Sequence, residues 1–255
     1  MAEGDSIFRL AGRLHRSFAG AQVRRSSVRR RVEDPALFDG DQLLEVAARG
    51  KHLLMRFASG RTLHSHLRMQ GTWRSARTPP RGHRVTAWFD FGDSGFLVAH
   101  AMPVLDVVPT AEEDRVVGHL GPDVLAEDWP RAIATIEQQP DRRIREAILD
   151  QRNLCGIGNL WAVEGLFVGG VWPHAPVEKV DVARLLELIA RMMRLGLRHG
   201  NQVTTGNTRR GETHWVDGRY RRPCRRCGTP IAFSPAGPGP YDRETWWCPH
   251  CQPEL

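Results

Sequence analysis

The chain has 255 residues, 41% hydrophobic and 25% charged, which excludes a disordered protein and fits one large domain or two modest ones. No apolar run approaches the roughly 18–20 residues that span a bilayer, so a transmembrane protein is excluded and no membrane partner is expected. The formal net charge of +7 fits a polyanionic partner, nucleic acid first, and on charge alone it fits a merely basic soluble protein equally well. Glu3, Asp5 and Arg9 argue against a secretory signal peptide, so the expected compartment is the cytosol.

The first predicted element is an amphipathic helix almost at the N-terminus. Asp5 or Ser6 can cap its start, and arginines occupy its polar face. Its apolar positions recur at helical spacing: Ile7, Leu10, Ala11, Leu14 and Phe18.

Short strand-like runs follow, each bounded by Gly, Asp, Pro or Ser, and residues 58–60 indicate a hairpin turn between two of them. The runs are 42–46, 52–57, 61–67, 85–91 and 96–100. Repeated short strands at this spacing predict a sandwich or a barrel.

The pattern changes to helical near residues 121–123. A long final helix is predicted to end at Gly200, and residues 201–222 show no periodicity and are expected to form a loop. The helical stretches are 132–136, 142–150, 159–167 and 185–197. The second half of the chain is therefore expected to be a helical domain.

Four cysteines close the chain with metal-ligand spacing. Cys224 and Cys227 form one C-x2-C pair, and Cys248 and Cys251 form a second after twenty residues. This spacing is typical of a structural Zn²⁺ site with four thiolate ligands, and disulfides are the alternative in a chain without a secretion signal. Cys155 lies in an apolar stretch and is interpreted as a packing residue.

Two further features can contact phosphate. The turn at residues 156–158 exposes backbone N–H groups at a helix start, although such corners are also often only structural. Arg243 lies in the loop between the cysteine pairs, where it can enter a groove or can simply be solvated.

Taken together, the motifs resemble the formamidopyrimidine-DNA glycosylase / endonuclease VIII family of base-excision repair enzymes over nearly the whole chain. The opening, Glu3-Gly4-Asp5, looks more like the endonuclease VIII branch. The motifs that carry the resemblance are 1–5 (MAEGD), 49–54 (RGKHLL), 66–71 (HLRMQG), 120–123 (LGPD), 149–159 (LDQRNLCGIGN), 223–224 (PC) and 243–252 (RETWWCPHCQ).

The resemblance implies a catalytic group at the N-terminus. In the family the α-amine of the residue after Met1, here Ala2, attacks the anomeric carbon of the damaged nucleotide and forms a Schiff base. Glu3 matches the acid/base carboxylate, and Lys51 matches a lysine that contacts phosphate and aids catalysis. Taken alone, Glu3 could be a helix-terminal charge and Lys51 a solvated turn residue.

The resemblance also implies the DNA contacts, because the damaged nucleotide must leave the duplex to react. Asn159 and Arg243 match two phosphate clamps, on the helix-two-turn-helix and zinc modules. The wedge loop that fills the gap left by the flipped base corresponds to Arg68, Met69 and Gln70, with ordinary core as the alternative for Met69. A buried Glu164 could help to hold the N-terminus, or could be a surface charge.

The sequence departs from the family at three positions. Ala2 replaces a proline, so the amine left after Met1 removal is primary rather than secondary, which can slow elimination. Asp217 and Arg221 stand where the family usually has an aromatic residue and a glycine. A damaged-DNA or abasic-site binding protein with impaired catalysis is therefore a competing hypothesis, and a zinc-ribbon RNA-binding protein is a third.

We predict an α+β multidomain protein: an N-terminal β-sandwich with a leading helix (1–122), a helix-two-turn-helix domain (123–215) and a zinc-finger module (216–255). The expected function is that of a bifunctional DNA glycosylase and abasic-site lyase that removes oxidised bases, pyrimidines above all. We expect a monomer that acts on damaged double-stranded DNA in the bacterial cytoplasm, at the nucleoid.

Overall fold

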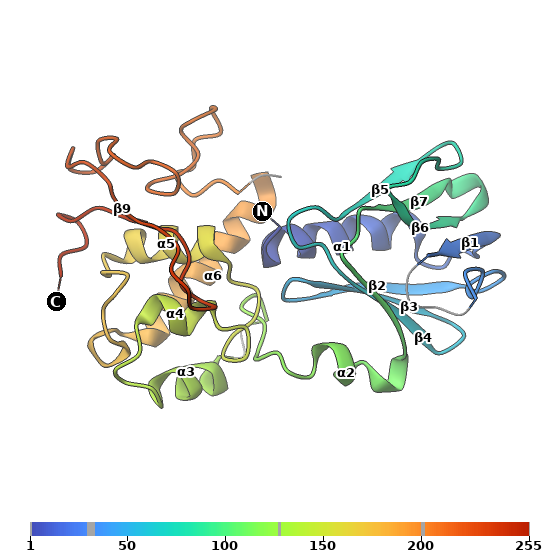
Figure 1. The fold of residues 1–255 in the computed structure, drawn as a ribbon, viewed down its shortest axis with the longest axis horizontal. Coiled ribbons are helices and arrows are strands. Elements are labelled where there is room, and N and C mark those ends of the chain that lie inside the picture. The colour runs from blue at the N-terminus through green and yellow to red at the C-terminus, as the bar shows by residue number, and fades with distance from the viewer. Residues whose placement is uncertain (1, 30–33, 127–128, 200–201, 255) are drawn as a thin grey trace. The chain divides into compact units, whose positions relative to one another are not determined.

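The computed structural model describes residues 2–29, 34–126, 129–199 and 202–254, leaving aside the side chain of His199 (Figure 1). Within these ranges the chain divides into two compact units, each with its own hydrophobic core. The first unit ends at His119 and the second begins at Leu120. None of the helices in the described part of the chain has the length and apolar character needed to cross a membrane.

Two four-stranded antiparallel sheets form the first unit, which fits the predicted sandwich. One sheet has the order β1-β6-β7-β5, with β1 Arg25–Val28, β6 Val85–Asp90, β7 Phe96–His100 and β5 Thr72–Ala76. The other has the order β2-β3-β4-β8, with β2 Leu43–Arg49, β3 His52–Phe57, β4 Arg61–His66 and β8 Val104–Pro109. A 3₁₀ turn, η1 Gly92–Ser94, connects β6 to β7.

Alternating side chains explain which strands the sequence reveals. In β6, Val85, Ala87 and Phe89 face the core, and the residues between them are more exposed. The strands β1, β5 and β8 were not predicted. In β5, Trp73 is the one buried residue, and polar residues fill most of the remaining positions, so the apolar alternation is missing.

Helix α1 Gly4–Phe18 carries the predicted apolar face into the core between the sheets, where Leu14 and Phe18 are fully buried. The predicted cap is wrong. The N-cap residue is Glu3, in extended conformation and without a side-chain cap hydrogen bond, and Asp5 lies inside the first turn, 3.6 Å from Arg9. An acidic residue in the first turn favours the helix through the helix dipole without being a cap.

A half-buried ion pair fixes the segment that leaves the sandwich. Arg56 donates from Nε and Nη2 to both carboxylate oxygens of Glu113, at 2.7 Å each, and Thr62 Oγ1 donates to the same carboxylate at 2.6 Å. These bonds hold η2 Thr110–Glu112 and α2 Asp114–Val117 on the outer face of the second sheet.

Helices form most of the second unit, with a core that includes the fully buried Trp161. Helices α5 Asn159–Gly169 and α6 Val182–His199 pack closely at Gly165 of α5. A Cβ at this position would meet Ile189 Cγ1 of α6 at 2.3 Å, so the contact requires glycine. This close packing holds α5 against α6. The helices are α3 Pro130–Glu137, α4 Ile144–Leu149, α5 Asn159–Gly169, the 3₁₀ turn η3 Val177–Lys179 and α6 Val182–His199.

Predicted and observed helices differ mainly at their ends. Helix α4 begins at Ile144, because Arg143 is extended and bridges Pro176. Gly200, the predicted end of the last helix, lies outside the described residues. Residues 202–222 contain neither helix nor strand, in agreement with the predicted loop.

The C-terminal part of the second unit contains a two-stranded antiparallel sheet, β9 Ala232–Ser234 and β10 Thr245–Trp247. It packs on α5 through a small cluster that includes Val163 and Phe167 of the helix and Ile231, Cys224 and Cys248 of the hairpin region. Gln252 strengthens this attachment, because its amide donates to the Val171 carbonyl at 2.7 Å. The cysteine-containing segment is therefore supported by the helices.

Candidate functional site

The N-terminal candidates precede α1 directly. Ala2 is half-buried and packs against the sandwich core, while the Glu3 side chain has no exposed surface. The Glu3 carbonyl accepts hydrogen bonds from the N–H groups of Ser6 and Ile7, at 3.0 and 3.1 Å. The first helical turn therefore fixes the backbone of Glu3. Ala2, the residue that supplies the predicted amine, directly precedes it in the sequence.

Lys51 occupies the two-residue turn between β2 and β3. Gly50 adopts φ +56°, which suits the mirror-image turns favoured in hairpins, and Arg49 pairs with His52 across the turn. The turn thus places Lys51 at the end of the second sheet, and its charge acts on the neighbouring histidines His52 and His66.

Those histidines form a cluster on the second sheet. His52 Nδ1 lies 2.8 Å from His64 Nε2, and the ring of His66 stands edge-on to His52 with centroids 4.7 Å apart. Burial, reinforced by the neighbouring histidines, lowers the pKa of His52 to about 3. Burial together with Lys51 and Arg68 lowers the pKa of His66 to about 4. Burial also lowers the pKa of His64, although Asp106 opposes the shift.

The predicted wedge loop projects from the end of β4. Arg68, Met69 and Gln70 are all exposed, and Met69 exposes 70% of its surface, which rules out the interpretation of Met69 as a core residue. The loop closes through the Gly71 N–H, which donates to the Leu67 carbonyl at 2.8 Å. The tip is thus an exposed apolar side chain on a tightly closed turn.

Asn159 begins α5, directly after Gly158, the N-cap residue in extended conformation. The preceding turn is tied by Gln151, whose Oε1 accepts from the Gly156 N–H at 3.0 Å and whose Nε2 donates to the Ile157 carbonyl at 2.9 Å. Gly156 adopts φ +107°, a conformation that favours glycine. The expected tight turn at a helix start is therefore present.

Arg145 joins the two predicted phosphate clamps. Its buried guanidinium donates from Nη2 to Asn159 Oδ1 at 2.9 Å and to the carbonyls of Arg243 and Glu244 at 2.6 and 3.1 Å. Asn159 Nδ2 donates to the Glu244 carbonyl at 2.9 Å. Arg243 itself is exposed. The structure therefore brings Asn159 and the Arg243 backbone together.

Sequence reasoning missed Arg145, which it treated only as part of a helical stretch. Burial lowers its pKa to about 10, yet the group stays charged near neutral pH. A charged residue among the apolar positions of Ile144, Ala147 and Ile148 was the available signal, because a buried charge needs several hydrogen-bond partners.

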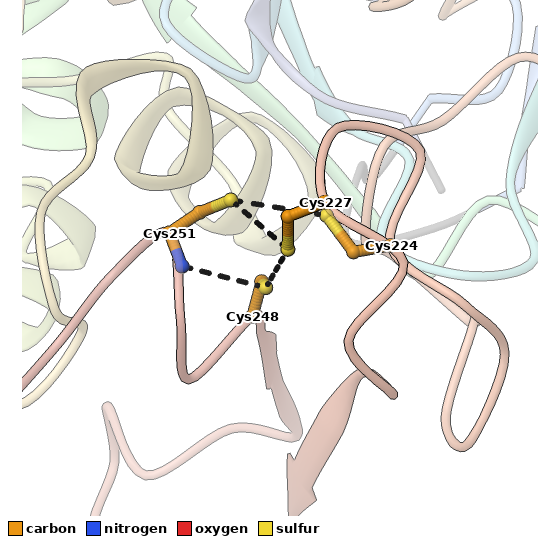
Figure 2. A group of neighbouring side chains, drawn as sticks. All are labelled: Cys224, Cys227, Cys248 and Cys251. Carbon is orange, nitrogen blue, oxygen red and sulfur yellow. Dashed lines mark hydrogen bonds between the residues drawn. The ribbon is translucent and has the colours of Figure 1, made fainter.

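The four cysteine sulfurs gather into one cluster, which Figure 2 shows. Cys227 Sγ lies 3.5 Å from the sulfurs of Cys248 and Cys251, Cys224 Sγ lies 4.0 Å from that of Cys251, and all four are within 4.8 Å of one another. A tetrahedral ion with metal–sulfur bonds of about 2.3 Å spaces its sulfurs by roughly 3.8 Å. The donor set therefore fits a single metal ion. Cys155 is fully buried, as expected of a packing residue.

Glu164 is fully buried on α5 and holds the loop that precedes the cysteines. Its carboxylate accepts from the N–H groups of Trp215, Val216 and Asp217, at 2.8, 2.7 and 2.8 Å, and from the hydroxyl of Thr204. The interpretation of Glu164 as a surface charge is wrong. These four donors give it an anchoring role within the second unit.

The two departures near the cysteines leave the turn intact. The Asp217 N–H is one of the donors to Glu164. Arg221 adopts φ +61°, the conformation that a glycine would take without strain, and its N–H donates to the Ile231 carbonyl at 2.9 Å. Its guanidinium lies over the ring of Tyr220, 5.0 Å from the centroid.

Two family models match the chain. One, described as the formamidopyrimidine-DNA glycosylase N-terminal domain, matches residues 1–100, and the other, described as the formamidopyrimidine-DNA glycosylase H2TH domain, matches residues 120–208. Together they cover most of the sequence.

Similar proteins extend over almost the entire chain. It is 42% identical over 264 residues to the "Probable endonuclease 8 2" of Streptomyces coelicolor, covering 99% of this chain and 94% of the relative. It is 38% identical over 255 residues to the "DNA-(apurinic or apyrimidinic site) lyase Nei2" of Mycolicibacterium smegmatis, covering 99% of each. The crystal structure of the MutM (Fpg) protein from Thermus thermophilus superposes with a TM-score of 0.81 at 27% identity, covering 99% of both chains.

A β-sandwich followed by a helix-turn region with a four-cysteine finger defines a class of DNA-repair glycosylases. The chain belongs to the formamidopyrimidine-DNA glycosylase / endonuclease VIII family. This membership confirms the expected fold class and the expected enzyme class, a bifunctional DNA glycosylase and abasic-site lyase that acts in base-excision repair.

The lowered histidine pKa values predict that the first unit loses stability in acid. Histidines of the unfolded chain bind protons below pH about 6.5, whereas His52 and His66 in the folded state resist protonation down to about 3 and 4. The two neutral histidines therefore make their full contribution to the free energy of unfolding above pH 6.5. As the pH drops toward 4, that free energy falls by about 1.4 kcal/mol per pH unit for each proton that only the unfolded state binds.

Urea unfolding between pH 4.5 and 8 measures this slope. The matched variant His52→Gln removes one of the titrating rings. We expect it to reduce the slope of unfolding free energy against pH by an amount that corresponds to at most one bound proton. A wild-type stability that is flat across this range contradicts the prediction.

Proposed function

We propose that the chain releases oxidised bases, above all pyrimidines, from duplex DNA through a Schiff base on the α-amine of Ala2. The observation that carries the proposal is the fully buried carboxyl group of Glu3, fixed at the start of α1 next in sequence to Ala2. The preference for pyrimidines rests on the opening Glu3-Gly4-Asp5, which resembles the endonuclease VIII branch.

The proposed chemistry begins with the neutral amine. An α-amine has an ordinary pKa of about 7.7–8.0, so a useful fraction is unprotonated near neutral pH once Met1 is removed. The nitrogen attacks the anomeric carbon, and the bond from that carbon to the base breaks. The base leaves with the bonding electrons and with the proton that the attacking nitrogen gives up. Glu3 then donates a proton to the ring oxygen, the sugar opens, and the imine forms.

Ala2 changes one step of this sequence. An imine made from a primary amine can lose its N–H proton and its positive charge, whereas an iminium made from proline must remain charged. Because the charge withdraws electrons during elimination, we expect strand cleavage to be slower than base release. The competing hypothesis, a damaged-DNA binder with impaired catalysis, rests on this same residue.

In the proposed complex, residues of both units contact damaged double-stranded DNA. The wedge comes from the exposed loop of Arg68, Met69 and Gln70, and Lys51 contacts a phosphate. Asn159 and Arg243 clamp phosphates, supported by the hydrogen bonds that fix them through Arg145. We propose that the chain works as a monomer in the bacterial cytoplasm, at the nucleoid.

We also propose that the four cysteines hold a structural Zn²⁺. Four thiolates at tetrahedral spacing fit zinc, and such closed sites stabilise folding instead of supplying an open position for catalysis. When bound, the ion supplies only this cross-link, and the chemistry is left to the N-terminal residues.

Borohydride trapping tests the proposed nucleophile. With an abasic duplex, we expect a covalent adduct whose peptide map places the sugar on Ala2, and intact mass should show that Met1 is absent. Glu3→Gln keeps the amine and removes the acid, and should slow base release by about 10²–10⁴-fold. The matched variant Ala2→Pro restores a secondary amine and should accelerate strand cleavage. Tight binding without adduct or base release supports the impaired binder instead.

The salt dependence of DNA binding tests Arg243. Arg243→Ala should weaken binding and reduce the slope of log K against log salt concentration by about 1, because one phosphate contact is lost. Arg184→Ala is the control, since Arg184 lies near Gly169 at the other end of α5, about 15 Å from Asn159 along the helix. Equal slopes for the wild type and Arg243→Ala exclude Arg243 as a clamp.

Metal analysis tests the zinc site. We expect one zinc ion per chain, and its chelation should unfold the hairpin region, because Cys224 and Cys248 belong to the cluster packed on α5. Cys248→Ser should lose the ion. Cys155→Ser, which changes a buried cysteine outside the cluster, should retain it. A hairpin region that stays folded with all four ligands changed to serine would refute the proposed metal.

A further inference from the structure

A row of polar side chains lies on the outer face of the second sheet. The strand register sets His52 opposite His66 and His64 opposite Asp106. His64 and His66 are two residues apart in β4 and therefore share a face, while Ser65 between them turns inward and accepts a hydrogen bond from Trp73 of the other sheet at 3.0 Å. The row leads from β8 toward the loop at the end of β4.

The hydrogen bonds along this row define the tautomers of two rings. His64 Nδ1 lies 3.3 Å from Asp106 Oδ2, and because a carboxylate can only accept, His64 Nδ1 carries the proton. In neutral His64 the other nitrogen, Nε2, is then a bare acceptor. His52 Nδ1, 2.8 Å away, must therefore donate to it. Asp106 thus orients both His64 and His52.

His66 continues the row to the exposed loop. The Arg68 N–H donates to His66 Nδ1 at 3.1 Å, and Arg68 adopts φ +47°, a left-handed conformation that is strained for a residue other than glycine. At the other end of the loop, a Cβ at Gly71 would meet the Leu67 carbonyl and Met102 Sδ at 2.8 Å each. The strained backbone is therefore held from both sides.

We propose that His66, held in place by His52, His64 and Asp106, is a positioning residue that fixes the Arg68–Gln70 loop in the shape needed to fill the gap left by a flipped base. The inference rests on the proposed function of that loop. It adds that the loop needs the neutral imidazole of His66 to keep its shape, and that the Met69 side chain alone is not sufficient to fill the gap.

The electrostatics of the cluster support this role. Only a neutral imidazole with a bare Nδ1 can accept the Arg68 N–H, because imidazolium has a proton on both nitrogens. Burial, Lys51 and Arg68 lower the pKa of His66 to about 4, so the acceptor persists at neutral pH. The cationic groups that a phosphate-binding surface requires thus also keep His66 neutral.

A pair of substitutions isolates the acceptor. His66→Leu removes it, whereas His66→Asn places the amide Oδ1 at the same number of bonds from the backbone as Nδ1. We expect single-turnover base release from a lesion in an intact duplex to fall about five- to tenfold in His66→Leu and to return to within about twofold of the wild type in His66→Asn. Borohydride trapping on an abasic single strand, which has no gap to fill, should be equal in all three proteins.

Two structural measurements separate this inference from the proposed function. Hydrogen exchange of the Arg68 amide should be slow in the wild type and in His66→Asn and at least about fivefold faster in His66→Leu. Long-range ¹⁵N–¹H NMR spectra should show Nδ1–H tautomers for His52 and His64 and an Nε2–H tautomer for His66.

Each outcome decides one of the two claims. If the wild type releases no base, the proposed function fails, and Arg68 exchange still decides whether His66 holds the loop. Unchanged exchange in His66→Leu overturns the positioning role, and so does a duplex rate for His66→Asn as low as that for His66→Leu. A charged His66 at pH 7 overturns it as well.

Discussion

One buried guanidinium organises the second unit. Arg145 has almost no contact with solvent, so its charge depends on the acceptors around it. These are the Asn159 side chain and the carbonyls of Tyr241, Arg243 and Glu244. If the start of α5 or the loop before β10 moved away, the buried cation would have too few acceptors. Leaving a buried charge without its partners typically costs several kcal/mol of folding free energy. The start of α5 and the loop before β10 are therefore locked together, although more than eighty residues separate them in the sequence.

The same constraint recurs with the opposite sign. Glu164 is buried three residues after Trp161 on the same helix, and three consecutive N–H groups of the chain around Val216 converge on its carboxylate. Helix α5 thus carries an anchor at its first residue and a second one about a turn and a half later. The first fixes the loop between the two cysteine pairs, and the second fixes the segment that precedes the first pair.

The sequence was sufficient to predict those features in which a local pattern of residue types reflects a single physical requirement. The cysteine spacing specified its cluster, and alternation in β6 and the helical repeat of α1 specified their buried faces. Strands β1 and β5 escaped prediction because their pairing depends on backbone hydrogen bonds to β6 and β7, with little apolar alternation of their own. Arg145 and the histidine row escaped it for a related reason: their partners come from distant segments, and a single sequence holds no record of which segments meet.

Two of the departures from the family pattern affect different features of the molecule. At Arg221 the hydrogen bond to Ile231 and the stacking on Tyr220 offset the strain of a left-handed residue. At residue 2, the side chain does not take part in the proposed bond-making, since the nucleophile is the backbone nitrogen. What that chemistry requires is an amine next to the buried carboxyl of Glu3, and Gly4 begins the helix that fixes this carboxyl whether residue 2 is proline or alanine. In the proposed mechanism, the substitution therefore acts on the charge of the imine, which governs elimination, and leaves the position of the attacking nitrogen to the fold.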